Sequence, residues 1–188
     1  MSGGVRFPWA VARNVALSLI DALDGAVEGI RIAGSLRRMK PDVGDVELVF
    51  VPAMSKAGLF GDESVDLADR RIEGLLKMGI LAKRANVKGG YAWGEKNKLA
   101  VHVESGIPVD LFATTAAAFE NYLVCRTGPA ESNMAIASKA KAMGYRWNPY
   151  GVGFTRLADG EVFAMGTEKD VFEFVGLPFL SPEERGTR

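Results

Sequence analysis

The segment from residue 31 to residue 51, RIAGSLRRMKPDVGDVELVFV, is the feature that most constrains the fold of this chain. Its two ends are rich in β-branched and aromatic residues, so residues 30–34 and 45–52 are predicted strands. The loop between them contains Pro41 and Gly44, which interrupt regular structure. Two strands of this composition predict a buried sheet, so the charged residues among them need a specific explanation.

Acidic residues recur with strand spacing in this region. Because alternate side chains of a strand point the same way, Asp45 and Glu47 share one face, and Val46 and Leu48 are buried on the other. Neighbouring carboxylates raise each other's pKa unless a cation lies between them. Asp110, in IPVDLFATT, is a third acid within a predicted strand. Three carboxylates without a thiol or imidazole nearby suit Mg²⁺ or Mn²⁺ better than zinc.

The Gly34–Ser35 pair supplies the second half of a phosphate-binding arrangement. Glycine lets a ligand approach the backbone closely, and a hydroxyl beside free amides can bind an anion. Arg37 and Arg38 follow, and an arginine fork can hold phosphate oxygens, although adjacent residues in an extended loop cannot both face one ligand. These residues predict a metal triphosphate held between the Gly-Ser-Arg turn and the acidic strand.

Each of these features also has an ordinary interpretation when it is taken alone. An edge strand often alternates charged and apolar residues, and Gly-Ser is common in turns. The combination is more specific, because Gly-Ser is followed by nine residues and then by Asp, apolar, Glu, apolar. This spacing matches the general pattern of the nucleotidyltransferase superfamily, so we favour the functional interpretation.

The other elements expected before residue 115 surround these two strands. Apolar residues at helical spacing predict a helix over residues 8 to about 26, and SVDLADRRIEGLLKM predicts another over 64–78. Residues 51–64 are interpreted as a connector. Short apolar segments between residues 81 and 115, separated by glycine-bearing turns, predict mostly antiparallel strands.

The chain changes character near residue 115, where we place a boundary between residues 1–115 and 116–188. The second part is predicted to contain two helices, a hairpin, a closing helix with Thr167 as its N-cap, and a frayed tail. Their ranges are 116–125 and 130–144 for the helices, 145–157 for the hairpin, 167–176 for the closing helix and 181–188 for the tail.

Composition excludes several classes of protein. The 188 residues carry 23 basic and 23 acidic side chains, so a bound polyanion must meet a local basic patch. One cysteine, Cys125, cannot form an intramolecular disulfide, and a single histidine, His102, leaves nothing for a zinc site. Without a signal peptide or a run long enough to span a bilayer, we expect a soluble, cytoplasmic protein that binds no membrane.

Five basic residues form the best candidate for a phosphate-backbone track on this neutral chain, with ordinary solvated charge as the alternative for each one. We interpret His102 as structural, Cys125 as a core or subsite residue, and the tryptophans mainly as packing residues. The candidate track consists of Lys83, Arg84, Lys88, Lys96 and Lys98.

The segment AGSLRRMKPDVGDVELV resembles the catalytic segment of family X DNA polymerases, the DNA polymerase beta group. GEKNKLAVHV and VDLF resemble the strand pair that holds that family's third carboxylate. RTGPAESNMAIASKAKAMGYRWNPYGV is similar to the family's Thr-Gly turn, helix and Asn-x-Tyr segment, and TEKDVFEFVGLPFLSPEER to its C-terminal signature. The resemblance runs from about Arg6 nearly to the end, and it is close to bacterial and viral members.

This resemblance implies an α/β (α+β) fold in two parts. Residues 1–115 would form a nucleotidyltransferase palm, a mixed, largely antiparallel sheet flanked by helices. Residues 116–188 would form a small helical and hairpin subdomain that binds the nascent base pair. The lyase domain and helical DNA-binding module of larger members have no room in this sequence, so we expect no deoxyribose-phosphate lyase activity.

The resemblance also implies a set of site residues. Asp45 and Glu47 would hold both of two Mg²⁺ or Mn²⁺ ions, and Asp110 would hold the catalytic one and is a candidate proton acceptor. The implied triphosphate contacts are Gly34, Ser35, Arg38 and Gly44, the contacts to sugar and base are Thr127, Gly128, Asn133 and Tyr150, and the DNA contacts are Lys88, Lys96 and Lys98.

The chain departs from the family pattern at several of these positions. Glu47 stands where the family usually has a second aspartate. Cys125 and Arg126 stand where many members have an aromatic pair before Thr-Gly, and Pro108 replaces an arginine near the primer terminus.

The activity implied is template-directed addition of a deoxynucleotide to a primer 3′-hydroxyl, in short-gap repair synthesis. Its partners would be gapped or primed DNA and deoxynucleoside triphosphates, bound by a monomer. Two alternatives stay open. One is a template-independent nucleotidyltransferase that acts on a nucleic-acid end, a protein or a small molecule, and the other is a DNA-binding module whose catalysis has decayed.

Overall fold

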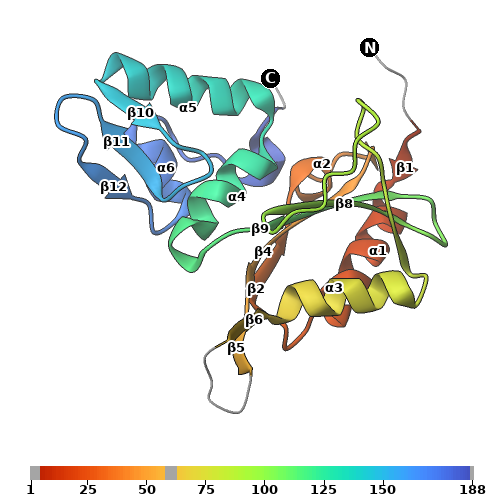
Figure 1. The fold of residues 1–188 in the computed structure, drawn as a ribbon. Helices are drawn as coiled ribbons and strands as arrows, with labels where there is room; N and C mark the ends of the chain where they lie inside the picture. Colours follow the sequence, from red (N-terminus) through yellow and green to blue (C-terminus); the bar gives the residue numbers. More distant parts are fainter. Residues whose placement is uncertain (1–4, 58–62, 187–188) are drawn as a thin grey trace.

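The computed structural model describes residues 5–57 and 63–186. At its centre lies a five-stranded sheet in which β4 and β9 run parallel while the other neighbouring pairs run antiparallel. The predicted mixed sheet flanked by helices is therefore confirmed (Figure 1). In spatial order the strands are β2 (Val27–Ile32), β4 (Val46–Pro52), β9 (Pro108–Ala113), β8 (Asn97–His102) and β7 (Leu81–Lys83).

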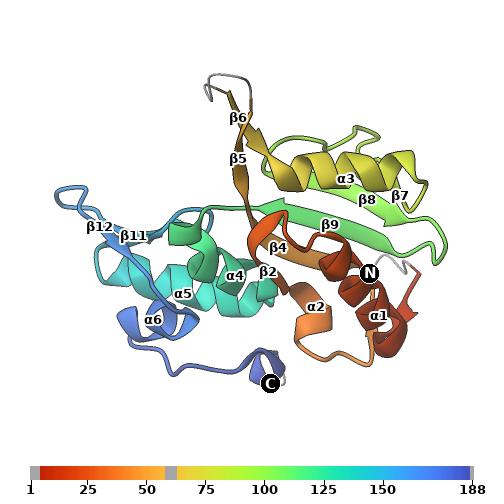
Figure 2. The same ribbon diagram turned by 90° about the horizontal axis from the view of Figure 1, so that it is seen from below.

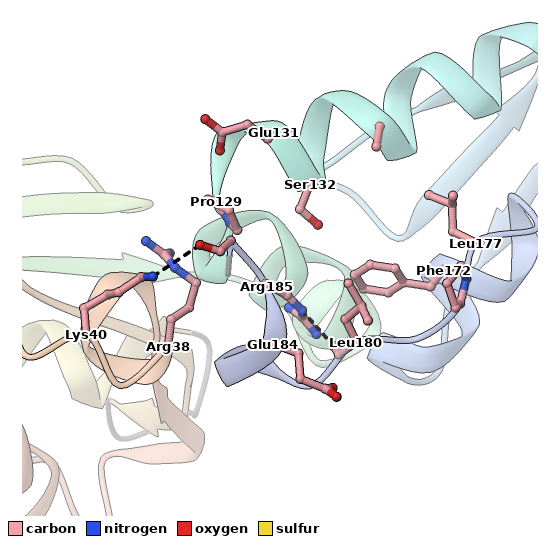
Figure 3. A pocket seen from close by; sticks show the side chains of 13 residues that line it. Arg38, Lys40, Pro129, Glu131, Ser132, Phe172, Leu177, Leu180, Glu184 and Arg185 are labelled. Atoms are coloured by element: carbon pink, nitrogen blue, oxygen red, sulfur yellow. Dashed lines mark hydrogen bonds between the residues drawn. The ribbon is translucent and has the colours of Figure 1, made fainter. Parts of the chain in front are cut away.

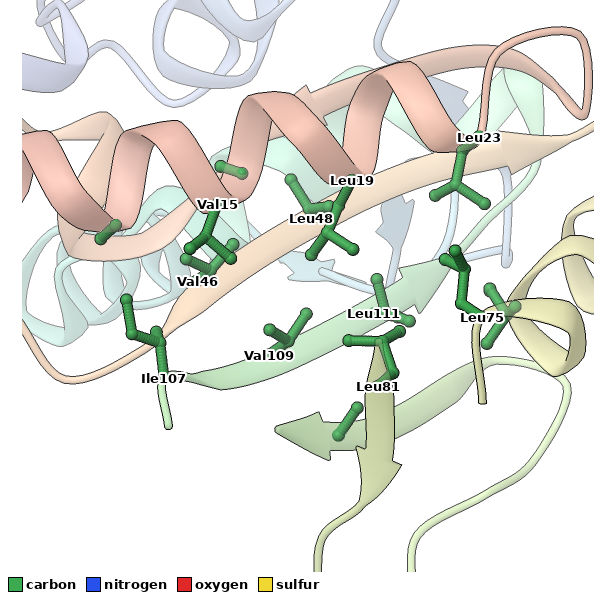
Figure 4. Packing of buried hydrophobic residues seen from close by; sticks show 14 of the residues in the cluster. Val15, Leu19, Leu23, Val46, Leu48, Leu75, Leu81, Ile107, Val109 and Leu111 are labelled. Carbon is green, nitrogen blue, oxygen red and sulfur yellow. The ribbon is translucent and has the colours of Figure 1, made fainter. Parts of the chain in front are cut away.

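Helices α1 (Trp9–Ala22) and α3 (Leu67–Lys77) cover one face of the sheet. Figure 4 shows Val15 and Leu19 of α1 directed toward Val46 and Leu48 of β4. Leu75 of α3 closes the same apolar layer, and all five side chains are buried. Because Val46 and Leu48 face these helices, the alternating acids of the same segment must face the other side of the sheet.

A third helix, α4 (Phe119–Thr127), packs against that second face. Val49 of β4 and Phe112 of β9 form a small buried cluster with Tyr122 and Leu123 of α4. A 3-10 turn over Ala116–Ala118 leads from the end of β9 into this helix. The cluster joins the sheet to the C-terminal part of the chain on the side where the acids lie.

The C-terminal elements gather on one side of the molecule, away from α1 and α3, in both ribbon views (Figures 1 and 2). They have a core of their own, which includes Val124, Ile136, Phe154 and Val171. The predicted hairpin has a third strand that the sequence did not indicate. The elements are α5 (Ala130–Ala142), β10 (Tyr145–Trp147), β11 (Gly153–Arg156), β12 (Val162–Ala164) and α6 (Glu168–Phe174).

One buried amide fixes the hairpin loop to α4. Asn121 Nδ2 donates to the carbonyl oxygens of Asn148 and Gly151, each at 2.8 Å, and its Oδ1 accepts from Nε1 of Trp147 at 2.7 Å. A fully buried amide with all of these bonds formed holds its surroundings in one arrangement. The loop after β10, which contains Tyr150, is therefore positioned by α4.

Three local expectations need correction. The Gly-Ser segment is a one-turn helix, α2 (Gly34–Arg37), rather than a simple turn. The predicted connector contains two antiparallel strands, β5 (Met54–Ala57) and β6 (Glu63–Asp66), and residues 58–62 lie outside the described residues. Helix α3 starts at Leu67 rather than at residue 64, because Asp66 caps it by accepting from the Asp69 amide at 2.8 Å. A further strand pair joins β1 (Phe7–Pro8) and β3 (Asp42–Val43).

The tail was expected to fray, and for its described part this is wrong. A 3-10 turn, η2 (Pro182–Glu184), precedes Arg185, whose side chain is fully buried. Arg185 Nε donates to the carbonyl of Leu180, and Nη2 donates to Oε2 of Glu168, both at 2.9 Å. Residues 187 and 188 lie outside the described part. Within the described ranges, no helix combines the length and apolar character that a bilayer span requires.

Candidate active site

The fold brings the three predicted acids onto one face of two neighbouring strands. Glu47 and Asp110 are direct partners in the parallel β4–β9 register, and Asp45 comes two residues before Glu47. The Glu47 carboxylate packs against Gly34, which has φ +62°, and a Cβ there would collide with Oε1 of Glu47. Glycine is therefore required at position 34 by both the left-handed backbone and this close approach.

In the acidic cluster, burial and mutual repulsion outweigh the nearby arginine charges and raise the pKa of each acid. Burial raises the pKa of Glu47 to about 8, and the charges of Asp45 and Asp110 add to this effect. Burial also raises the pKa of Asp45, again with a contribution from Asp110. The pKa of Asp110 is raised by burial, but Arg84 opposes this change. An all-oxygen donor set with unfavourable mutual repulsion has the chemistry that a divalent hard cation prefers.

The third acid, Asp110, forms an ion pair with Arg84. Arg84 Nη2 donates to Oδ1 of Asp110 at 2.5 Å, from the segment that follows β7. In the described part of the chain, no three His, Cys, Asp or Glu side chains stand close enough together to hold a metal ion. The donor chemistry therefore fits such an ion, and binding it through all three acids would require acidic side chains to move from the positions they have here.

The paired arginines of the Gly-Ser-Arg segment both contact Thr127. Arg37 contacts the C-terminal part of the chain, where Nη1 donates to Oγ1 of Thr127 at 2.7 Å and Nη2 lies 2.5 Å from Oε1 of Glu168. Arg38 Nη1 donates to the Thr127 carbonyl, and its Nε is buried without a hydrogen-bond partner among the described residues. Ser35 lies in the first turn of α2, and Gly44 lies immediately before Asp45.

The predicted contacts to sugar and base are divided between α4, α5 and the hairpin loop. Thr127 is buried at the end of α4, and Gly128 follows it with φ +59°. Asn133 on α5 donates from Nδ2 to the Cys125 carbonyl at 2.8 Å, and its Oδ1 has no partner in the described structure. The Tyr150 side chain is 63% exposed.

The predicted DNA contacts need one correction. Lys88 and Lys96 are exposed, as a phosphate contact requires. The Lys98 side chain is only 6% exposed, its Nζ lies 2.6 Å from Oδ1 of Asp69, and it donates to the Gly94 carbonyl at 2.9 Å. A buried and paired ammonium cannot reach a DNA phosphate, so Lys98 acts as a structural residue here.

Several residues outside the predicted site have the surroundings expected of structural residues. His102 Nδ1 lies 2.8 Å from Oγ of Ser105. Trp147 is buried, and Trp93 is half-buried with its Nε1 donating to Oε1 of Glu73 at 2.9 Å. Cys125 is half-buried on α4, and burial raises the pKa of its thiol.

Sequence reasoning missed three roles. Arg84 was grouped with the basic track and not recognised as the partner of Asp110, because the β7–β8 register cannot be read from the sequence. Arg126 was noted only as a departure, yet its guanidinium carbon lies 3.6 Å from the ring centroid of Phe112. Nothing in the sequence distinguishes Glu168 from any acid in the first turn of a helix, but it is buried between Arg37 and Arg185.

A cavity of about 720 Å³ lies beside this site, between the end of α2, the start of α5 and the C-terminal segment (Figure 3). Arg38 and Lys40 line it from one side, and Glu131 and Arg185 from the other. None of the three clustered acids lines it. Because its wall mixes both charges and lacks the acids, we assign no reaction to this cavity.

Comparison with known proteins relates this chain to a set of polymerases. Residues 122–186 match the family model described as DNA polymerase beta thumb. Over 183 residues the chain is 26% identical to the DNA polymerase/3'-5' exonuclease PolX of Bacillus subtilis (strain 168). That match covers 96% of this chain, and the chain spans 28% of the length of this relative.

Proposed function

Because this chain is a family X DNA polymerase-like protein, we propose that it is a template-directed DNA polymerase that adds deoxynucleotides to a primer 3′-hydroxyl. The observation that supports this most is the register of β4 and β9, which pairs Glu47 with Asp110 and places Asp45 beside them. Such a row of carboxylates next to a Gly-Ser-Arg helix combines a place for metal ions with a place for phosphates.

Asp45, Glu47 and Asp110 would hold two Mg²⁺ or Mn²⁺ ions, in keeping with their donor chemistry. When bound, the ions lower the pKa of the 3′-hydroxyl and neutralise the triphosphate. The 3′-oxygen forms a bond to the α-phosphorus, the bond from that phosphorus to the leaving oxygen breaks, and pyrophosphate departs. We assign Asp110 as the acceptor of the 3′-hydroxyl proton, because the resemblance to family X polymerases implies a position for it beside that hydroxyl.

The other residues of the proposal bind and orient the substrates. The backbone at Gly34 and Gly44, the Ser35 hydroxyl and the Arg38 guanidinium would bind the triphosphate. This assignment requires Arg38 to leave the Thr127 carbonyl that it contacts now. Thr127 and Gly128 would lie beside the sugar, and Asn133 and Tyr150 beside the base pair.

We propose the division into a palm, residues 1–115, and a C-terminal subdomain, residues 116–188, which binds the nascent base pair. Exposed Lys88 and Lys96 would contact the phosphates of gapped or primed DNA. The proposed role is short-gap repair synthesis by a monomer. The matched thumb region supports this arrangement, because it starts at Tyr122 and includes α5 and the hairpin.

Primer extension on a one-nucleotide gapped duplex tests the function directly. The assay supplies Mg²⁺ or Mn²⁺ and each nucleotide in turn, with an Asp45→Ala, Asp110→Ala double variant beside the wild type. An Asp21→Asn variant is the control, because Asp21 is exposed on α1 in the layer opposite the acids. We expect incorporation of the complementary nucleotide by wild type and control only. Untemplated tailing would instead indicate a template-independent transferase, and DNA binding without incorporation a decayed module.

A further inference from the structure

A second pocket, of about 450 Å³, opens between the sheet and the C-terminal hairpin. We call it the Tyr150 pocket. Its lining comes from two sources, the adjoining ends of β8 and β9 on one side and α4 with the hairpin loop on the other. The sheet side of the pocket includes Lys96, Asn97, Thr114 and Thr115, and the opposite side includes Arg126 and Tyr150.

The pocket adjoins the acidic face of the sheet. Phe112 follows Asp110 by two residues on β9, so their side chains share a face and are separated by roughly 7 Å along the strand. Asn97 is the register partner of Phe112 and lies on the same face. Arg126 covers the Phe112 ring at 3.6 Å from its centroid. A group bound in the pocket would therefore be a close neighbour of the reacting atoms.

The guanidinium group of Arg126 forms one wall of this pocket, and an aromatic cage of Phe112, Tyr122 and Tyr150 surrounds it. The Arg126 guanidinium carbon lies 5.2 Å from the ring centroid of Tyr122 and 5.5 Å from that of Tyr150, and Nη2 donates to the Tyr122 hydroxyl at 3.1 Å. The rings of Tyr122 and Tyr150 meet edge to face at 5.7 Å. Tyr150 is backed by this cage and is still 63% exposed, so it presents a fixed aromatic surface to the pocket.

Polar groups without protein partners surround this surface. In the described structure, the side chains of Lys96, Asn97, Thr114 and Thr115 form no hydrogen bond or ion pair with the rest of the protein, and neither does the Tyr150 hydroxyl. Amide and hydroxyl groups can form hydrogen bonds with the edge of a nucleobase, and an exposed aromatic ring can stack on its face. An ammonium group can bind the phosphate of the same nucleotide.

We propose that the Tyr150 pocket binds an unpaired nucleobase of the template strand, next to the coding position, stacked on Tyr150 with its phosphate near Lys96. This inference rests on the proposed function for the identity of the strand. It assigns Tyr150 to the neighbouring template nucleotide rather than to the incoming one. The pocket would keep the unpaired template from folding back over the coding base.

The test uses primed DNA with a single-stranded template overhang, in which the nucleotide next to the coding position is either intact or abasic. Equilibrium binding is measured by fluorescence anisotropy at fixed salt for wild type, Tyr150→Ala, Tyr150→Phe and Tyr91→Ala. Tyr91 is a matched control, because it is 67% exposed and does not line the pocket. A melting curve for each variant checks that it is folded.

We expect the abasic change to weaken binding by wild type about tenfold, within the range that one base–aromatic stack contributes. Tyr150→Ala should bind both DNAs equally, while Tyr150→Phe and Tyr91→Ala should discriminate like wild type. Equal binding of both DNAs by wild type overturns the pocket assignment and leaves the polymerase proposal standing. Failure of wild type to bind either DNA contradicts both.

Discussion

At the scale of single residues, the central feature is a half-buried glutamate, Glu47, whose charge repels those of the neighbouring acids. Burial and the nearby charges of Asp45 and Asp110 raise the pKa of Glu47 from an ordinary value of 4.5 to about 8. Between these two pH values the folded protein binds more protons than the unfolded chain, so its stability falls as pH rises. Glu47 does not change the stability at pH values below its pKa in the unfolded chain. Its full destabilising effect is reached above its pKa in the folded protein.

Glu47→Gln should therefore flatten the pH dependence of stability. In buffer with a metal chelator, we expect the melting temperature of wild type to fall between pH 5 and pH 8, and that of the variant to fall several degrees less. The neutral amide avoids the unfavourable charge of the folded state. Parallel melting curves for both proteins across this range would contradict the electrostatic account of the cluster.

Arg84 competes with a cation for Asp110 through their 2.5 Å contact. Arg84→Gln removes a positive charge next to the acids, so we expect it to bind Mn²⁺ several-fold more tightly than wild type. The free Mn²⁺ signal in electron paramagnetic resonance measures this affinity without requiring activity. Arg70→Gln is the control, because Arg70 is exposed on α3 in the opposite layer. Unchanged Mn²⁺ affinity in Arg84→Gln would exclude this competition.

At the scale of elements, the sequence correctly predicted features that depend on residues close together in the chain. The alternation around Val46 and Leu48 correctly indicated which face of β4 is buried, and Thr167 was correctly predicted to cap α6. Rules of this kind could not predict that β7 places Arg84 at Asp110, because this depends on the pairing of strands distant in sequence. The β5–β6 strand pair was missed because its glycine-bearing segment also fits a connector.

The cap of α6 can be tested alone. Thr167 Oγ1 accepts from the Asp170 amide at 3.1 Å, and Asp170 Oδ2 accepts from the Thr167 amide at 2.8 Å. Thr167→Ala should cost about 1 kcal/mol of unfolding free energy, or roughly 2–4 °C in melting temperature. Ser138→Ala, at an exposed position within α5, should change stability by less than about 0.5 kcal/mol. Equal effects of the two changes would argue against the cap.

At the scale of the whole molecule, the two parts of the chain are joined by a buried ionic group. Glu168 lies between Arg37 of α2 and Arg185 of the C-terminal segment. Burial opposes its ionisation, but the hydrogen bond from Arg37 and the charges of both arginines outweigh burial and lower the pKa of Glu168. The tail that was expected to fray thus supplies one charge of the group that connects α2 to the C-terminal part of the chain.

Glu168→Gln should be strongly destabilising, because it leaves two largely buried guanidinium groups without a counter-ion. We expect a loss of about 3 kcal/mol of unfolding free energy in denaturant titration. Glu161→Gln removes a carboxylate that is 54% exposed beside Arg156, and it should change stability by less than about 1 kcal/mol. A Glu168 variant as stable as the Glu161 variant would show that this buried group does not hold α2 to the C-terminal part of the chain.

At this scale, we propose that the three acids act as one unit in templated nucleotide transfer. The most direct measurement is single-turnover incorporation on gapped DNA by wild type, by Asp45→Asn and by Asp110→Asn, with Asp21→Asn as the control. We predict that wild type and control insert the nucleotide complementary to the template, and that each of the other two variants falls to background while its melting temperature shows it folded. Templated incorporation by Asp110→Asn at the wild-type rate would contradict the account.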